Sequence, residues 1–507
     1  MRRSLITIAV VLIVGHAGRI VDGVELVGAA RWQATVAAGR PAPLALDGQT
    51  AVLPKDHLGR EYLLIITIGN SSHRRFLPTI FTAGPYVHFA RVGATLELVA
   101  DTRGLAFRPN TAPRIIGTFP ITGETSKALH FTFHGSNIAG LAPTTVHLRS
   151  QLTGNGWATI ETVEQLTDED GPITRVVRYT LKEPPTPDFQ ALVVPAELRH
   201  RYFTMDRFLP SWEVPMELAM RWEIRRPISF SISPNTPLAY RAAIREGALA
   251  WNAAFGREVV TVDVAPAGVT PGDPRYNLIQ WVEDDGLVLA RGESVADPLT
   301  GQIIYAMVEI ASGWAILSSA ESRALEMTSA DGSTMSLEGL QSAVRCTHDV
   351  AQFSLDPLHA VVQQLGTDKR QALAEQRLRA VVMHEIGHVL GLRHNFAGSL
   401  DTAFTQEADA EDLASLLEGT RLPGAPLPSS SIMDYLPLQD DVRMDRIGKY
   451  DEAAIAWLYG ITASSTDLAE LRFCTDDHLA TAKDVPEEPK IADCQRYDHG
   501  MEPIGRY

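Results

Sequence analysis

Short apolar runs punctuated by turns fill the first third of the chain. The clearest lie at 62–68, 95–99, 144–148 and 173–181, and Gly, Pro and Asn residues separate them. Runs of this length between turn residues are typical of β-strands. The sequence therefore predicts a β-rich domain, whose strand-like runs lie between about residues 48 and 183. No group of residues in it indicates a chemical reaction, so its expected role is structural or substrate-presenting.

The pattern changes after about residue 212, where helical repeats join the strands. Strands are predicted at 228–232, 276–282 and 303–310, and helices at 238–255 and 450–459. These elements predict an α+β domain over 212–465, followed by a polar tail over 466–507. A chain of 507 residues with 45% hydrophobic residues can bury at least two cores.

A further helix is expected to begin near Thr367 or Asp368. Met383, Ile386 and Leu390 recur in it at i, i+3 and i+7, so these three side chains are predicted to face the core. The residues between them then face the opposite side, where a cleft is expected.

That opposite side carries the most informative pattern of the chain, HExxHxxGxxH, formed by His384, Glu385, His388, Gly391 and His394. Two histidines four apart project from one face of a helix and can bind one tetrahedral metal ion. A glycine can adopt a positive φ, end the helix and turn the chain, so that the last histidine returns as a third ligand.

Three protein ligands leave one coordination position open, which is the arrangement of a catalytic zinc site. The predicted ligands of Zn²⁺ are His384, His388 and His394, and Glu385 is the predicted general base that takes a proton from the activated water. A buried helix that merely contains histidines is the alternative, but five fixed positions make such a coincidence remote.

A second motif, Ser431-Ile432-Met433-Asp434-Tyr435, resembles the Met-turn of the metzincin zinc endopeptidases, which also carry HExxHxxGxxH. The resemblance implies a metzincin-like catalytic domain with a mixed twisted sheet, a metal-binding helix and a C-terminal helix. It also implies that Met433 packs beneath the imidazoles. Tyr435 is then a candidate catalytic residue that binds zinc or donates to the oxyanion.

Several other segments are similar to a family of large secreted bacterial zinc-dependent metalloproteases with an N-terminal β-rich domain of unknown function. The similar segments are 202–204, 222–224, 251–255, 297–301, 393–396 and 494–498. The resemblance implies that the β-rich N-terminal domain spans residues 25–207. Longer members of that family carry a further C-terminal region.

The N-terminus has the features of a secretory signal. Arg2 and Arg3 precede an apolar run over 5–15, and small residues follow at 15–17. The run is shorter than the roughly twenty residues that span a bilayer. Residues 1–17 are therefore predicted to be a signal peptide of a secreted or periplasmic bacterial protein, with no stable membrane insertion after cleavage.

The net charge and the cysteines limit which partners, disulfides and metal ligands are expected. The formal net charge is -16, which argues against a nucleic-acid partner. The chain has three cysteines, so one is unpaired within the monomer, and Cys474 with Cys494 is the favoured bridge. No cysteine lies before Cys346, so a propeptide thiolate cannot bind the zinc.

The preferred hypothesis is a secreted zinc-dependent endopeptidase that acts on a protein or peptide substrate. The alternative is a binding or adhesion protein with a structural or vestigial zinc site on a peptidase scaffold. The presence of Glu385 favours the enzyme, because a structural site needs ligands but no base. Hydrolysis of a non-peptide bond is a third possibility.

Overall fold

The computed structural model describes residues 42–497 apart from 73–77, 81–84, 102–113, 135–142, 169–170, 186–187, 208–215, 286, 316–343, 346–360, 363, 403–405, 462–465, 480–489 and 492. The predicted signal peptide and Cys346 lie outside the described residues.

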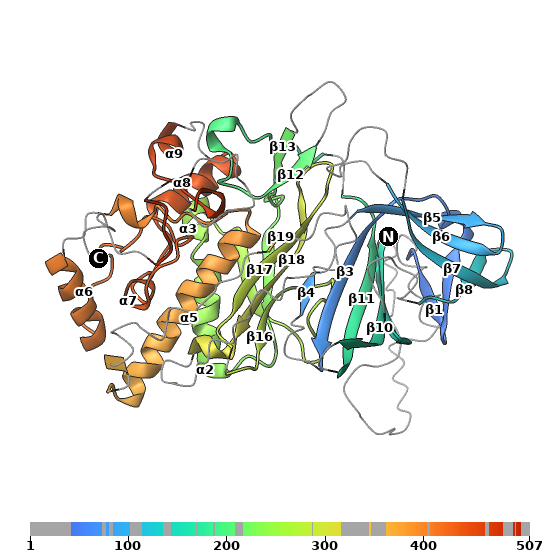
Figure 1. Cartoon of the computed structure of the whole chain (residues 1–507), viewed down its shortest axis with the longest axis horizontal. Coiled ribbons are helices and arrows are strands. Elements are labelled where there is room, and N and C mark those ends of the chain that lie inside the picture. The colour runs from blue at the N-terminus through green and yellow to red at the C-terminus, as the bar shows by residue number, and fades with distance from the viewer. Residues whose placement is uncertain are drawn as a thin grey trace, which may run out of the picture.

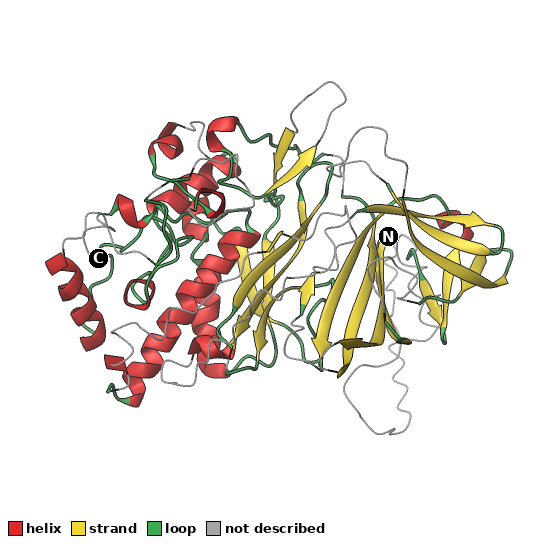
Figure 2. Ribbon diagram, in the orientation of Figure 1, coloured by secondary structure: helices red, strands yellow, loops and turns green. Residues whose placement is uncertain are grey.

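The N-terminal part forms an antiparallel sheet of eleven strands (Figures 1 and 2). The strand order is β1-β2-β8-β7-β6-β5-β3-β11-β10-β9, and β4 pairs with β3. The strands are β1 (Ala45–Asp47), β2 (Thr50–Pro54), β3 (Tyr62–Ser71), β4 (Thr79–Ile80), β5 (Tyr86–Val92), β6 (Thr95–Ala100), β7 (Arg114–Glu124), β8 (Ala128–Phe131), β9 (Thr145–Gly154), β10 (Trp157–Asp168) and β11 (Gly171–Lys182). The four runs predicted as strands overlap β3, β6, β9 and β11.

The C-terminal part is built on a six-stranded sheet with the order β15-β14-β16-β18-β17-β19. Strands β14, β15, β16 and β18 are parallel, and β17 runs antiparallel between β18 and β19. The strands are β14 (Ile228–Ile232), β15 (Val260–Val264), β16 (Asn277–Val282), β17 (Ala290–Ala296), β18 (Ile303–Ala311) and β19 (Val344–Arg345), and β12 (Thr204–Arg207) pairs separately with β13 (Met216–Ala219).

The helices of this part are α2 (Leu238–Leu249), α3 (Asn252–Phe255), α5 (Thr367–Val389), α6 (Gln406–Glu418), α7 (Leu438–Asp441), α8 (Lys449–Leu458) and α9 (Thr466–Glu470). Helix α5 begins at Thr367, as predicted, and α8 matches the helix predicted at 450–459. The helix predicted at 238–255 is divided into α2 and α3. Within the part of the chain that the structure describes, none of the helices combines the length and apolarity that a bilayer crossing requires.

Strands β15, β17 and β19 of this sheet were not predicted. Strand β17 contains Arg291, Gly292 and Glu293, and such polar and flexible residues weaken the signal of a strand. Gly292 and Glu293 are nevertheless buried and Arg291 is largely covered, because other parts of the chain pack on both faces of the sheet. Helices α2 and α5 lie on one face, and the N-terminal sheet lies on the other (Figure 1).

Successive side chains of β18 point to opposite faces of the sheet. Ala306, Val308 and Ile310 belong to the core beneath the helices. Tyr305 and Met307 point the other way and share a cluster with Ile65 and Ile80 of the N-terminal sheet. A strand that is apolar on both faces is typical of a sheet buried on both sides.

Charged groups reinforce this contact between the two parts. Arg291 forms an ion pair with Glu309 at 2.5 Å and donates to the carbonyl oxygen of Pro78 at 2.6 Å. Glu293 accepts hydrogen bonds from the Thr79 hydroxyl at 2.9 Å and the Ile80 N–H at 2.8 Å. Because buried charges need partners, the N-terminal sheet stabilises the polar face of β17.

Some residues ahead of Arg207 pack with the C-terminal part. Val194, Leu198, Tyr202 and Met205 belong to the same hydrophobic core as α5. The predicted polar tail also packs closely, since a disulfide joins Cys474 to Cys494, as predicted.

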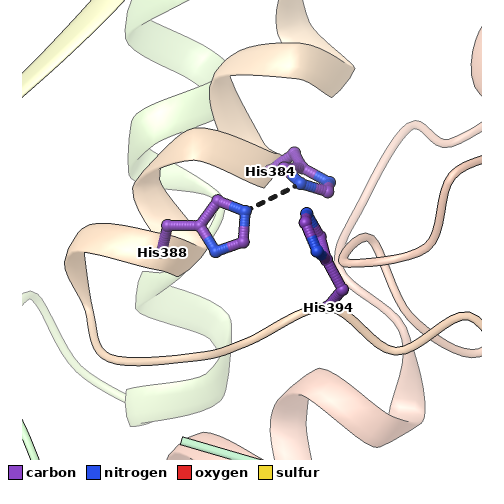
Figure 3. A group of neighbouring side chains, drawn as sticks. All are labelled: His384, His388 and His394. Atoms are coloured by element: carbon purple, nitrogen blue, oxygen red, sulfur yellow. Dashed lines mark hydrogen bonds between the residues drawn. The ribbon is translucent and has the colours of Figure 1, made fainter. Parts of the chain in front are cut away.

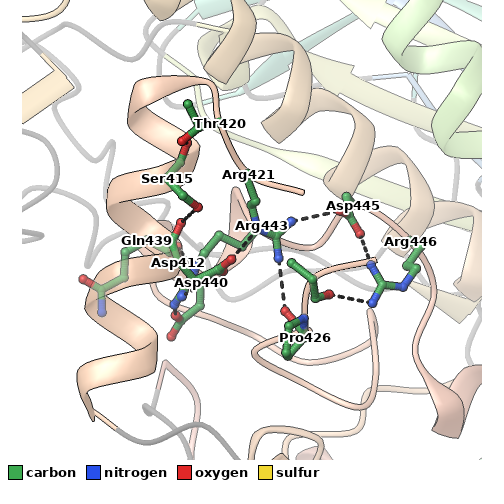
Figure 4. A network of polar contacts seen from close by, with 11 residues as sticks. Asp412, Ser415, Thr420, Arg421, Pro426, Gln439, Asp440, Arg443, Asp445 and Arg446 are labelled. Atoms are coloured by element: carbon green, nitrogen blue, oxygen red, sulfur yellow. Dashed lines mark hydrogen bonds and ion pairs between the residues drawn. The ribbon is translucent and has the colours of Figure 1, made fainter. Parts of the chain in front are cut away.

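An ion-pair network fixes the loops that follow α6 (Figure 4). Arg421 pairs with Asp412 at 2.9 Å and with Asp445 at 2.8 Å. Arg443, which is fully buried, pairs with Asp412 and Asp440. These contacts tie α6 to the chain on both sides of the Met-turn segment.

We predict that Glu309→Gln lowers the free energy of unfolding by on the order of 3 kcal/mol, because it leaves the buried Arg291 guanidinium without its closest counter-charge. Chemical denaturation measures this change. Asp56→Asn is the control, since its pair with Arg60 is exposed and should contribute less than about 1 kcal/mol. An equal loss of unfolding free energy in the two variants would show that the buried Arg291–Glu309 pair does not stabilise the contact between the N-terminal and C-terminal parts.

Candidate metal centre

The end of α5 places the third histidine. Gly391 has a φ of 109°, which an L side chain rarely adopts. The Gly391 N–H donates to the His388 carbonyl at 2.9 Å, and the Leu392 N–H donates to the Gly387 carbonyl at 3.0 Å. This pair of bonds is the Schellman motif, which ends a helix and reverses the chain. The turn predicted at Gly391 is therefore present, and it directs His394 back toward the helix.

The three imidazoles meet at one point (Figure 3). His384, His388 and His394 each offer one ligand atom, and these atoms lie within 4.8 Å of one another. The Nε2 atoms of His384 and His388 are 3.0 Å apart. Tetrahedral zinc with Zn–N bonds of about 2.0–2.1 Å separates its nitrogen ligands by roughly 3.3 Å. All three side chains are buried, so the donor set fits a zinc ion.

The Nδ1 atoms of the first two histidines are held by backbone carbonyls. His384 Nδ1 lies 2.7 Å from the carbonyl oxygen of Ile432, and His388 Nδ1 lies 2.9 Å from that of Leu392. Since a carbonyl only accepts, each Nδ1 must carry the proton. Each Nε2 atom then keeps a lone pair for a metal ion.

His394 is held by a side chain instead. Its Nδ1 lies 2.7 Å from Oδ2 of Asp476, in the segment predicted to be a polar tail. Asp476 was not predicted as a site residue, because 82 positions separate it from His394. The only nearby sequence feature that could have indicated a fixed position for Asp476 is Cys474, two positions earlier. Its disulfide to Cys494 closes the loop that contains Asp476.

Burial sets the protonation of the site. It lowers the pKa of His388 well below the ordinary imidazole value, and the neighbouring His394 lowers it further. A neutral imidazole is the form that binds metal. Burial also raises the pKa of Glu385 well above the usual carboxyl range, although the Gly292 N–H and the Arg291 charge oppose this rise.

Gly292 brings β17 against the metal helix. A Cβ atom at this position would lie 2.6 Å from the Glu385 carbonyl oxygen and 3.3 Å from its Oε2 atom. Only glycine therefore permits the strand to approach Glu385 this closely. Strand β17 is the antiparallel strand next to the site, and β19 pairs with it at Glu293 and Ser294.

Met433 lies beneath the metal helix. It is fully buried, and a Cβ atom at Gly387 would lie 2.3 Å from its sulfur. The Met433 carbonyl accepts the N–H of Asn395 at 2.9 Å, next to the third histidine. The methionine thus packs against the helix between the first two histidines, where the Met-turn resemblance places it.

A buried carboxylate holds the Met-turn in place. Asp451 accepts hydrogen bonds from the Ser431 hydroxyl, the Ile432 N–H and the Gly448 N–H, each at 2.7 Å. Asp451 belongs to α8, so the helix that closes the domain also positions the carbonyl that orients His384.

Tyr435 lies beside the imidazoles. Its ring centroid is 4.5 Å from that of His394 and 5.6 Å from that of His384, and Tyr497 stacks on it at 5.7 Å. The three histidines and Tyr435 therefore lie together, and Glu385 follows His384 in α5.

A model of the Met-zincin family matches residues 366–484, which run from the start of α5 to beyond Asp476. No curated protein and no solved structure matches the chain. The match and the histidine cluster support a metzincin-like domain, and together they suggest a zinc metallopeptidase.

We predict that Asp451→Asn destabilises the protein by about 1–3 kcal/mol, because an amide offers one acceptor oxygen where three donors converge. Chemical denaturation with and without zinc measures the effect, and zinc should stabilise this variant less than the wild type. Glu452→Gln, an exposed change at the next position, should stay within about 0.5 kcal/mol of the wild type. A similar result for both variants would contradict the role of Asp451.

Proposed function

We propose that the protein is an exported zinc endopeptidase that hydrolyses proteins or peptides. One observation carries the proposal: three buried imidazoles direct their metal-binding nitrogens to a common point. A buried glutamate, Glu385, directly follows the first of these histidines in α5. The Met-zincin match over the same residues supports the peptidase class.

The predicted ligands are His384, His388 and His394. A zinc ion held by them would supply Lewis-acid chemistry, acidifying a water molecule and polarising a scissile carbonyl. Glu385 accepts the proton of the attacking water and passes it to the leaving amine. Its burial supports this role, because a carboxylate removed from solvent binds a proton more strongly.

Two further parts of the site support a peptide substrate. Tyr435 lies against two of the imidazoles and is the proposed donor to the oxyanion that forms during attack. Among the described residues, strand β19 pairs with β17 only at Glu293 and Ser294. The rest of that side of β17 is the proposed docking site, where an extended peptide would add a strand by backbone hydrogen bonds.

Export is proposed from the sequence of residues 1–17, which has the charge and apolar pattern of a signal peptide. The disulfide between Cys474 and Cys494 supports an oxidising compartment outside the cytoplasm.

We predict that Glu385→Gln lowers the hydrolysis of unfolded casein by roughly 10²–10⁴-fold while zinc content stays that of the wild type. The amide keeps the size of the side chain but cannot accept the proton. Proteolysis assays and elemental analysis measure the two quantities. Glu375→Gln, the same change nearer the N-terminal end of α5, is the matched control and should retain activity.

Wild-type hydrolysis in Glu385→Gln would show that this residue is not the base. Cleavage that persists after chelation would exclude a zinc mechanism. A wild-type protein that binds zinc tightly but cleaves neither casein nor a peptide library would favour the binding or adhesion alternative.

We also predict that Tyr435→Phe lowers kcat by roughly 10²–10³-fold with little change in KM, because the lost donor acts on the transition state rather than on the bound substrate. Steady-state assays with a fluorogenic peptide measure both constants. Tyr240→Phe, which removes a hydroxyl near the other end of α5, is the control. An unchanged kcat in Tyr435→Phe would refute the oxyanion role.

A further inference from the structure

The third histidine differs from the other two in what orients it. Backbone carbonyls hold His384 and His388, whereas the Asp476 carboxylate holds His394. A carbonyl stays in place as long as the backbone does. A carboxylate on a distant loop must itself be held, so the contacts around Asp476 decide whether His394 keeps its orientation.

The loop that carries Asp476 is fastened to the ligand segment. The Phe396 N–H donates to the Cys474 carbonyl at 2.9 Å, and the Cys474 N–H donates to Oδ1 of Asn395 at 3.3 Å. Asp476 begins the short helix η7 (Asp476–His478), two residues after Cys474. The chain directly after His394 and the start of the loop therefore lie side by side.

The other end of the loop is held by the disulfide and by an arginine. Cys494 is bonded to Cys474, which lies 20 positions earlier in the sequence. Arg496 pairs with Oδ1 of Asp476 at 2.5 Å, while Oδ2 faces His394. The same guanidinium lies over the Phe396 ring, 5.1 Å from its centroid. Both carboxylate oxygens of Asp476 thus have a fixed partner.

We propose that Asp476 is a positioning residue of the metal centre and that the Cys474–Cys494 disulfide keeps it in place. Asp476 accepts the Nδ1 proton of His394, which fixes the tautomer and the ring orientation and makes Nε2 a stronger donor to a metal ion. The predicted polar tail is therefore part of the site. This inference rests on the proposed zinc site but requires no hydrolysis.

The test measures zinc affinity by competition with a chromophoric chelator, using the full chain. Asp476→Ala removes the acceptor and should weaken zinc binding about 10–100-fold, the usual cost of losing such a partner. The unfolding midpoint of the metal-free protein should change no more than in Asp493→Ala, an exposed aspartate next to Cys494. Asp476→Asn keeps an acceptor without the charge and should give a smaller loss.

Cobalt adds a readout that a purely structural role would not alter. The visible absorption of bound Co²⁺ reports the geometry of its ligands, so Asp476→Ala should change the spectrum and Asp493→Ala should not. Replacing both Cys474 and Cys494 by serine should weaken zinc binding by a similar factor. Adding Asp476→Ala to that variant should cause little further loss, because both changes act through one contact.

Wild-type zinc affinity in Asp476→Ala would overturn the proposal. If that variant does not fold, unchanged affinity and an unchanged cobalt spectrum in Asp476→Asn would overturn it as well. Fully additive losses would refute the role of the disulfide. A wild-type protein that binds zinc but hydrolyses nothing would refute the proposed function and leave this inference standing.

Discussion

A neutral imidazole has one donor nitrogen and one acceptor nitrogen, and this property constrains the whole C-terminal part of the fold. To direct three Nε2 lone pairs to one point, the protein must give each Nδ1 proton an acceptor. The acceptors are the Leu392 and Ile432 carbonyls and the Asp476 carboxylate. They come from the helix end, the Met-turn and the C-terminal loop, so three segments distant in sequence must meet around one helix.

The remaining packing holds those segments. Asp451 of α8 fixes the backbone that presents the Ile432 carbonyl, and the Schellman turn at Gly391 fixes that of Leu392. Gly387 leaves the space that the Met433 sulfur occupies. The helix, the turn and α8 thus support one another, because moving any of them would misdirect an imidazole.

The N-terminal sheet is connected to the same site through β17. Gly292 faces Glu385 on one side of this strand, while Arg291 and Glu293 face partners in the N-terminal sheet on the other. Alternate residues of one strand therefore contact the metal helix and the β-rich part. The Met-zincin match covers only residues 366–484. Strand β17 and the N-terminal sheet lie outside this range, so the matched region packs against parts of the chain that the match does not include.

The sequence by itself determined the features that local spacing controls. It predicted the ligand helix, its start near Thr367 or Asp368, the reversal at Gly391 and the Cys474–Cys494 bridge, because a repeat, a glycine or the short spacing of two cysteines indicates them directly. It did not reveal β17, the division of α2 from α3 or Asp476. Tertiary structure decided these features. Strand β17 can contain polar residues because the N-terminal sheet supplies their partners. Nothing local distinguishes Asp476 from other aspartates, since only the disulfide and the folded core bring it to His394. Long-range pairing has no periodic signal in a single chain, since the partner that satisfies a buried group can come from any segment.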